Sequence, residues 1–169
     1  IPHNVLRHFP IVPRLQRLFH DANPREDVLW HSRNQEYRYQ NVMSHPSHGS
    51  EWKTFNHKHK KVAADPRNIR LGLASDGFNP FGHQSTTYSM WPMLVYPLQH
   101  ASKCLHQRIK LHDGLAHPRS KKSWKDFDLF MEPLVEELQQ LWKGVLTRDL
   151  CASADFFLRV VIIWCIHDY

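Results

Sequence analysis

Long apolar runs are missing from this sequence of 169 residues. No stretch approaches the roughly 20 consecutive apolar residues that a membrane-spanning helix needs. The chain begins at Ile1 rather than at a methionine, and its first residues lack the pattern of a secretory signal peptide. We therefore expect a soluble protein with one domain or part of one, and a piece of a longer chain.

Cysteine is scarce as well. The three cysteines, Cys104, Cys151 and Cys165, form no Cys-x-x-Cys pair, and any disulfide scheme leaves one of them unpaired. This argues against a disulfide-stabilised secreted scaffold and favours a reducing compartment. Histidine is abundant, with 14 residues, but the His-Lys-His run at 57–59 lies among lysines. It indicates a solvated basic helix face more than a metal site.

Acidic residues are nearly absent from residues 98–125. The whole chain has a net charge of +6, and this segment alone holds seven lysines and arginines against one acid, Asp113. The remainder of the chain is therefore neutral. A basic balance ordinarily indicates a polyanionic partner, but an excess confined to one segment weakens that inference for the protein as a whole.

Two apolar segments are followed by an aspartate. Residues 69–75 predict a strand with Asp76 at its tip, and the run at 156–166 is typical of a central buried strand, with Asp168 close behind it. Carboxylates from neighbouring strands can hold two Mg²⁺ ions about 3.5–4 Å apart for phosphoryl transfer. The simpler alternative is that Asp76 is a turn residue and Asp168 a strand terminator, and the residues alone favour it.

The other segments predict a mixture of strands and helices. Residues 88–96 form an apolar run broken by Pro92, which indicates an edge strand or a bulge that could pair with the strand at 69–75. Residues 127–142 have helical apolar spacing with early acids, which predicts the clearest helix. A short helix should begin at Ser50, after a loop or weak helix.

Five segments carry a specific family resemblance. They are FPIVPRLQRLF at 9–19, DPRNIRLGLASDGFNPFG at 65–82, YSMWPMLVYP at 88–97, FMEPLVEELQQLWKGV at 130–145 and WCIHDY at 164–169. In this order, and over nearly the whole chain, they resemble the plant CACTA (En/Spm-type) DNA transposases. The last segment is similar to the family's WTINDFPAY, cut short.

The resemblance implies a cut-and-paste transposase of the DDE/D type, with an RNase H-like fold and an acidic triad that uses Mg²⁺. Its first two acids correspond to Asp76 and Asp168, as catalytic and metal-binding residues. Residues 1–64 would then be a helical and loop lead-in, and residues 65–169 a partial RNase H-like catalytic domain, a mixed sheet with flanking helices. The resemblance also implies transposon-end DNA as partner and a nuclear location, with no membrane and no small-molecule substrate.

Two departures from the family affect the expected activity. The family continues past its second aspartate into a Cys-x-x-Cys motif and the third acid, and a cysteine-containing segment precedes its FPIVPRLQRLF. Neither is found here. The glutamates of the predicted helix, Glu132, Glu136 and Glu137, fit a solvated helix face better than substitute ligands. We therefore expect a fragment or degenerate remnant that does not cleave DNA.

Residues 98–125 interrupt the resemblance, and a shifted reading frame accounts for the interruption. In plausible codons, AHPRSKKSWK at 116–125 becomes LIPGPKSPG when read one base later, which resembles the family text before its (K/N)DFD. The same shift turns 111–115 into FMMAL and 98–103 into YNMPPN. We hypothesise an out-of-frame translation that disrupts one central strand, exposing sheet edges and apolar surface.

Two functions from different classes stay open. The first is the degenerate transposase remnant. The second is a non-catalytic DNA-binding or regulatory protein descended from a transposase, which would contact nucleic acid with its basic segment and with aromatic residues such as Trp91 and Trp124. DNA affinity that falls steeply with salt would favour the second. A product that is not made, or that does not fold, is the third outcome to be tested.

Overall fold

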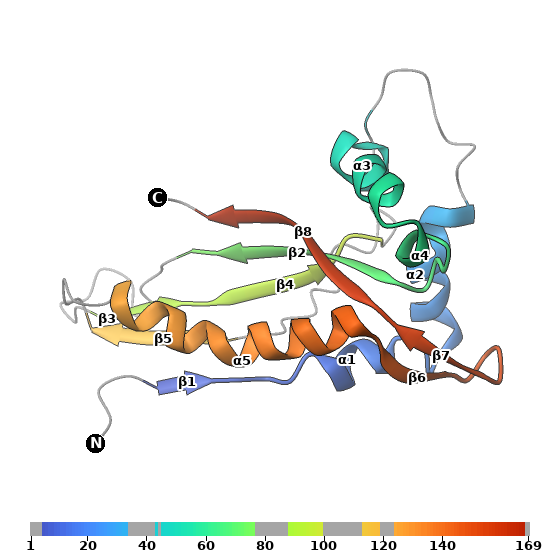
Figure 1. The fold of residues 1–169 in the computed structure, drawn as a ribbon. Helices are drawn as coiled ribbons and strands as arrows, with labels where there is room; N and C mark the ends of the chain where they lie inside the picture. The colour runs from blue at the N-terminus through green and yellow to red at the C-terminus, as the bar shows by residue number, and fades with distance from the viewer. Residues whose placement is uncertain are drawn as a thin grey trace.

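The computed structural model of the chain describes residues 5–33, 43, 45–76, 88–99, 113–118 and 124–167. Its strands are β1 (Val5–Arg7), β2 (Ile69–Ser75), β3 (Tyr88–Trp91), β4 (Met93–Pro97), β5 (Asp113–Pro118), β6 (Val145–Asp149), β7 (Ala154–Leu158) and β8 (Val160–His167) (Figure 1). Its helices are α1 (Val12–Arg17), α2 (Ala22–Arg33), α3 (Ser50–Lys58), α4 (Lys60–Ala63) and α5 (Trp124–Lys143), with a 3-10 helix η2 (Pro46–His48). The predicted mixed α/β class is confirmed.

A mixed sheet of three strands, in the order β4-β2-β8, forms the centre. Strand β2 pairs antiparallel with β4 and parallel with β8, where Ser75 lies opposite His167. The predicted strand at 69–75 is confirmed. Of the run at 88–96, only the part after Pro92 pairs with it, because Pro92 separates β4 from β3, which pairs in another sheet. The parallel pairing requires a long crossover, which α5 and the β6-β7 hairpin provide.

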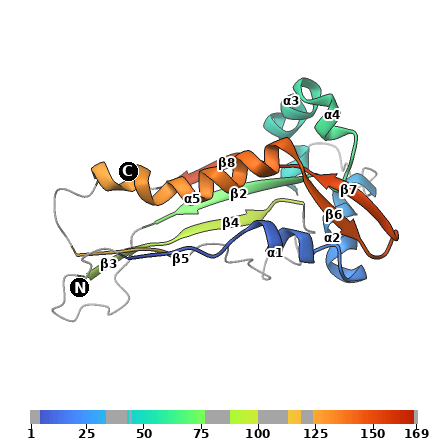
Figure 2. The same ribbon diagram turned by 60° about the horizontal axis from the view of Figure 1, so that its bottom comes forward.

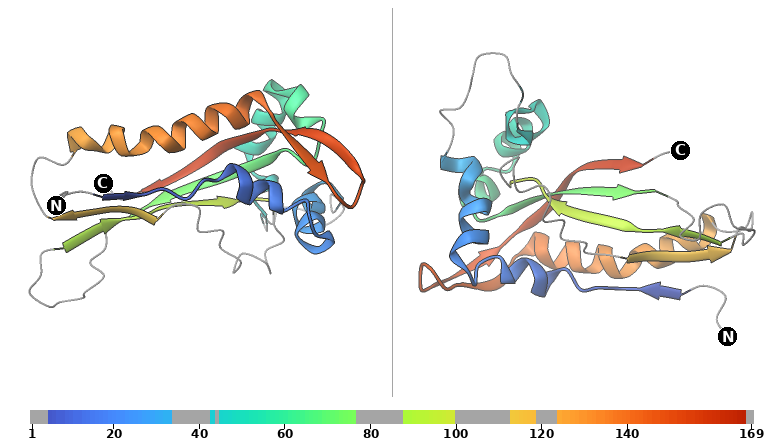
Figure 3. Two further views of the ribbon diagram at one scale, coloured as in Figure 1. Left: turned by 90° about the horizontal axis from the view of Figure 1, so that it is seen from below. Right: turned by 180° about the vertical axis from the view of Figure 1, so that it is seen from behind.

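Helix α5 lies along one face of this sheet (Figure 2, Figure 3). Its Leu134 and Leu141 have no exposed surface. They join Leu71 of β2 and Val160 of β8 in one hydrophobic cluster. Truncating such a leucine to alanine costs about 2–5 kcal/mol, so this interface is a main source of stability. The helix predicted at 127–142 is confirmed.

The N-terminal helices contribute to the same cluster. Leu15 of α1 and Phe19, just beyond it, are completely buried. The ring of Phe19 meets that of Phe156 edge-on, with centroids 4.9 Å apart. Helix α2 spans 12 residues where the sequence indicated a loop or weak helix. Burial of Val28 and Leu29 explains the difference, because tertiary packing overrides weak local preference.

The apolar run at 156–166 forms two strands rather than the single strand predicted. Strand β7 ends at Leu158 and pairs antiparallel with β6, whereas β8 begins at Val160. The predicted central position is also wrong, since β8 is at the edge among the described strands and Cys165 and Ile166 are exposed. An apolar run indicates strand structure, but it does not indicate which neighbour each part will pair with.

A second sheet has the order β1-β5-β3 and is antiparallel throughout. Strand β5 lies within residues 98–125, where the sequence predicted a disrupted strand. Residues 113–118 do form a strand, because backbone N–H and C=O groups of almost any residue can join a ladder, but this strand belongs to the second sheet and not to the central one. Most other residues of this segment lie outside the described ranges, and the reading-frame hypothesis stays a prediction.

The face of β2 opposite α5 meets α3. Alternate side chains of a strand point to opposite faces. Ile69 and Leu71 belong to the hydrophobic cluster, whereas the guanidinium of Arg70 lies over the rings of Trp52 and Phe55, 5.0 and 5.8 Å from their centroids. Helix α3, predicted to begin at Ser50 and confirmed there, thus covers a charged side chain at the start of the central strand.

Candidate functional site

The C-terminal ends of β2 and β8 lie side by side at one end of the central sheet. Ser75 is opposite His167 in the parallel ladder. Asp76 follows β2 directly and its side chain is exposed. Asp168, the second predicted site residue, follows His167 in the sequence and lies outside the described residues. The structure thus positions one predicted carboxylate and the strand that leads to the other.

The described residues at this end of the sheet fit a metal only in part. An exposed carboxylate such as Asp76 is the ligand type that Mg²⁺ prefers. Within the described ranges, however, no group of three or more His, Cys, Asp or Glu side chains could hold a metal ion. Ser75 Oγ, one residue before Asp76, is buried and has no hydrogen-bond partner in this part of the chain. No coordination geometry follows from a single carboxylate.

The three glutamates of α5 differ in their surroundings. Glu132 and Glu136 are exposed, as predicted for a solvated helix face. Glu137 is only 15% exposed, so that prediction is wrong for this residue. Its Oε2 accepts a hydrogen bond from the backbone N–H of Ile11 at 2.7 Å and lies 3.6 Å from His8 Nε2. This carboxylate holds the beginning of α1 against α5, where the helix dipole favours a negative charge.

A buried ion cluster that sequence reasoning missed lies at the end of β6. Asp149 has no exposed surface, and its two oxygens accept hydrogen bonds from Arg25 Nε at 2.8 and 2.9 Å. Its Oδ1 also accepts from the backbone N–H of Ala152 at 3.0 Å, and Arg67 Nη1 lies 3.7 Å from its Oδ2. Arg67 Nη2 in turn donates a hydrogen bond to Asp65 Oδ2 at 2.7 Å. This Asp149 cluster joins α2, the β6-β7 turn and the residues before β2.

Every charge in the Asp149 cluster has an opposite partner. Burial by itself would raise the pKa of Asp149, but hydrogen bonds from Arg25 and Ala152, with the positive charges of Arg25 and Arg67, lower that pKa below its ordinary value. The hydrogen bond to Asp65 raises the pKa of Arg67. Arg67 also stacks over the ring of Phe156 at 3.9 Å. The cluster is therefore balanced, as expected of a structural element.

The His-Lys-His run lies at the end of α3. His57 and Lys58 are exposed, as predicted for a basic helix face. The ring of His59 packs instead against Phe55 and Trp142, with centroids 4.7 and 5.3 Å away. Among the cysteines, Cys151 and Cys165 are free and exposed.

None of the helices in the described ranges has the length and apolar character to cross a membrane.

Comparison with known proteins gives one result that bears on this site. Residues 40–169 match the model of a family described as transposase family tnp2. The matched segment contains the whole central sheet, α5 and both predicted aspartates. No curated protein and no solved structure gives a significant match. Because the family model matches well over half of the sequence, the chain belongs to the transposase family tnp2.

Proposed function

We propose that the chain is a remnant of a CACTA-type cut-and-paste DNA transposase, in which Asp76 and Asp168 are two of the carboxylates that hold Mg²⁺. Membership of a transposase family supports DNA as the partner in general. The observation that carries the proposal is the parallel pairing of β2 with β8, in which Ser75 lies opposite His167. Each aspartate is the next residue in the sequence after one member of that pair.

The order of the elements supports an RNase H-like assignment. The resemblance implies that the first acid follows the first strand and that the second follows the strand after the first helix. Strand β2 comes before α5 and β8 after it, and the two strands are neighbours in the central sheet. The family match supports the transposase part of this proposal, and the plant CACTA assignment rests on the five resembling segments.

The role proposed for Asp76 is to supply a carboxylate oxygen at an exposed position that DNA can reach. Bound Mg²⁺ supplies, in sites of this kind, an activated water and stabilisation of the leaving oxygen. Two ions about 3.5–4 Å apart need more oxygen ligands than two aspartates provide. We therefore expect the polypeptide of residues 1–169 to bind divalent metal weakly and not to cleave DNA.

Metal binding is tested by titrating the polypeptide with Mn²⁺, a paramagnetic substitute for Mg²⁺, and following the broadening of backbone amide signals by NMR. We expect selective broadening at the ends of β2 and β8. Asp76→Asn should abolish it, whereas Asp128→Asn, which removes an exposed acid from α5, should leave it unchanged. Equal broadening in both variants, or none in the wild-type chain, would contradict the metal role.

Inactivity is tested by a plasmid-nicking assay with Mg²⁺. We expect no cleavage above the level of Asp76→Ala. Cleavage that is present in the wild-type chain and lost in both Asp76→Ala and Asp168→Ala would show an active enzyme instead of a remnant. The alternative of a non-catalytic DNA-binding protein depends mainly on residues 98–125, most of which lie outside the described ranges.

The reading-frame hypothesis has its own test, the nucleotide sequence of the transcript across residues 95–127. Codons that yield LIPGPKSPG one base out of frame would support decay of a transposase gene. Codons that yield no family-like text in any frame would contradict the hypothesis. A transcript already in frame for LIPGPKSPG would make the repaired chain the one to test for Mg²⁺-dependent transposition.

A further inference from the structure

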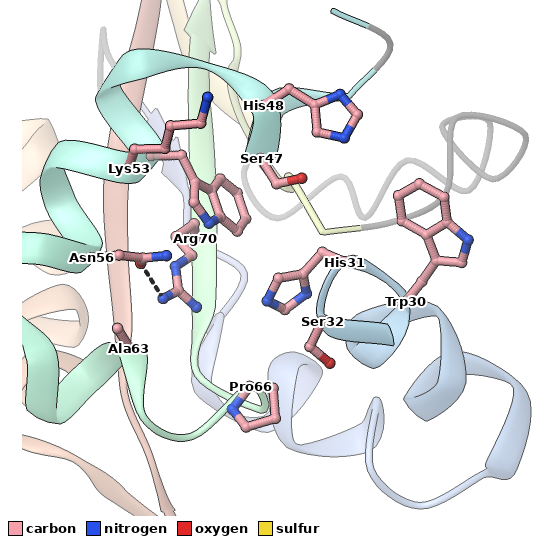
Figure 4. A pocket seen from close by; sticks show the side chains of 11 residues that line it. Trp30, His31, Ser32, Ser47, His48, Lys53, Asn56, Ala63, Pro66 and Arg70 are labelled. Atoms are coloured by element: carbon pink, nitrogen blue, oxygen red, sulfur yellow. Dashed lines mark hydrogen bonds between the residues drawn. The ribbon is translucent and has the colours of Figure 1, made fainter. Parts of the chain in front are cut away.

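A pocket of about 170 Å³ lies where the N-terminal helices meet the beginning of β2 (Figure 4). Its walls come from α2, η2, α3 and β2, and the guanidinium of Arg70 lies near His31 and Asn56 (Figure 4). The same guanidinium lies over the ring of Trp52. Asp76 is six residues further along, beyond the other end of β2, which corresponds to roughly 20 Å of extended chain. The pocket is thus separate from the proposed metal site.

Arg70 is a deeply buried cation whose hydrogen-bond partners are neutral. It is 1% exposed. Its Nη1 donates to the backbone oxygen of Asn68 and its Nη2 to Oδ1 of Asn56, both at 2.8 Å. Its Nε is buried and has no partner within the described ranges. Burial lowers the pKa of Arg70 to about 10, and no described carboxylate opposes that effect.

The other walls of the pocket include further basic and aromatic side chains. Lys53 supplies a second cation, and His31 and His48 contribute imidazole rings. None of the described residues that line the pocket is an aspartate or a glutamate. Trp52, only 3% exposed, packs against the guanidinium and restricts its orientation. A buried cation in such surroundings is unfavourable unless an anion joins it, because burying a charge is costly without a counter-charge.

His31 can donate a hydrogen bond to an anion through Nε2 only when its ring is protonated. Its Nδ1 lies 2.9 Å from the carbonyl oxygen of Val28, which places the proton of the neutral ring on Nδ1. Its Nε2 therefore gains a proton only when the ring becomes charged. Burial lowers the pKa of His31 to about 4, and the positive charge of Arg70 contributes. A bound anion would oppose the charge effect and raise this pKa.

We propose that this pocket binds one phosphate group, with Arg70 as its central ligand and Lys53 as a second cation. A guanidinium held in a fixed orientation suits an oxyanion because its planar donors match two oxygens at once. The same chemistry is available from free phosphate and from the phosphate groups of DNA. The inference goes beyond the proposed catalytic role and does not rest on it, because the carboxylate end of the sheet takes no part.

An NMR titration of the 169-residue chain with inorganic phosphate tests the proposal, with chloride at matched ionic strength as the reference. The imidazole signals of His31 and the indole N–H of Trp52 should shift saturably, and the pKa of His31 should rise. Arg70→Met should weaken phosphate binding by at least about tenfold, because charge-assisted hydrogen bonds are lost. Arg148→Met, which removes an exposed arginine from β6, should bind like the wild-type chain.

A conservative variant protects the test against misfolding. Arg70→Lys keeps the charge and loses the planar group, so its affinity should lie between those of the wild-type chain and Arg70→Met. Dispersed amide spectra establish that each variant is folded. If Arg70→Met does not fold, the weakened binding of Arg70→Lys and the rise of the His31 pKa in the wild-type chain decide the question.

Single-stranded oligonucleotides with and without a 5′-terminal phosphate distinguish the sources. If both oligonucleotides compete with inorganic phosphate, the pocket binds the phosphates of the DNA backbone. If only the phosphorylated oligonucleotide competes, it binds a terminal phosphate, and if neither competes, it binds free phosphate. Each of these outcomes agrees with the proposal. Absence of saturable shifts in the wild-type chain, or equal binding by Arg70→Met, would overturn it.

Discussion

Two buried groups of charges in this molecule differ in balance. Asp149, with no exposed surface, accepts hydrogen bonds from Arg25 and lies near Arg67, so each charge has an opposite partner. Arg70 is buried almost as completely, yet its described partners are neutral oxygens. A balanced buried cluster holds segments together, whereas an unbalanced cation indicates a place for a ligand. The two groups should therefore respond differently to the removal of a charge.

The largest effect is expected at the balanced group. Asp149→Asn should lower the free energy of unfolding by about 3 kcal/mol, because it leaves two arginines without their buried counter-charge. Urea denaturation followed by circular dichroism measures this value. The matched control is Asp155→Asn on β7, where the side chain is 53% exposed. Equal stability of the two variants would remove the distinction between buried and exposed ion pairs here.

The second largest effect is the loss of folding stability in acid that protonation of His31 in the pocket should cause. The pKa of His31 is about 4 in the folded chain and 6.5 ordinarily, so the unfolded chain takes up the proton first as the pH falls. The corresponding stability is complete above pH 6.5 and is lost between 6.5 and 4, by up to about 3 kcal/mol, since each pKa unit corresponds to about 1.4 kcal/mol. Unfolding free energies at several pH values should show this loss in the wild-type chain and in His57→Asn, but not in His31→Asn.

The acid response of Asp149 occupies a different pH range. Its folded pKa is lowered from 3.8, so its contribution is complete above that value and is lost only as the pH falls further. A loss of stability between pH 6.5 and 4 that persists in His31→Asn and disappears in Asp149→Asn would mean that the two groups have been assigned the wrong roles.

A small effect is expected from removing the unbalanced cation. Arg70→Met should change the free energy of unfolding by less than about 1 kcal/mol, since the lost hydrogen bonds are offset by relief of an uncompensated buried charge. The backbone oxygen of Asn68 would still accept from Gln99 Nε2. Thermal and urea denaturation provide the measurement. A loss as large as that of Asp149→Asn would show that Arg70 is a structural residue.

The smallest effect concerns an exposed pair on the β6-β7 hairpin. Arg148 Nη1 lies 3.0 Å from Asp155 Oδ1, and both side chains are about half exposed. Asp155→Asn should cost less than about 0.5 kcal/mol, because water and salt screen such pairs. The difference from the wild-type chain should vanish in high salt. A difference that persists there would mean that exposure is a poor guide to the strength of ion pairs in this chain.

Local patterns predicted the elements whose signals are local. The apolar spacing of α5 was sufficient to predict a helix, because α5 buries one face. The apolar segment of β2 was sufficient to predict a strand, because β2 lies within the central sheet. The division of the run at 156–166 was not predictable in this way, because pairing with β6 decides it. The position of Asp76 after a strand followed from the sequence, whereas Asp168 lies outside the described residues.

The charge groups were harder to foresee for a physical reason. Asp149 and its main partner Arg25 are 124 residues apart, and nothing in either local segment indicates the other. Arg70 offered one clue, a charged side chain inside an otherwise apolar strand, because arginine is rarely buried without a partner. The composition of its pocket depends on α2, η2 and α3 coming together, which no single segment specifies.

The parallel pairing of β2 with β8 also determines when the molecule can fold. The chain leaves the ribosome from its N-terminus, so β2 is available long before β8, and of its two partners among the described strands β4 is made first. Pairing of residues so distant in sequence is slow, since a long loop must close before the contact forms. One edge of β2 therefore stays open while the residues between β2 and β8 are made, and an open strand edge can pair with another chain and lead to aggregation.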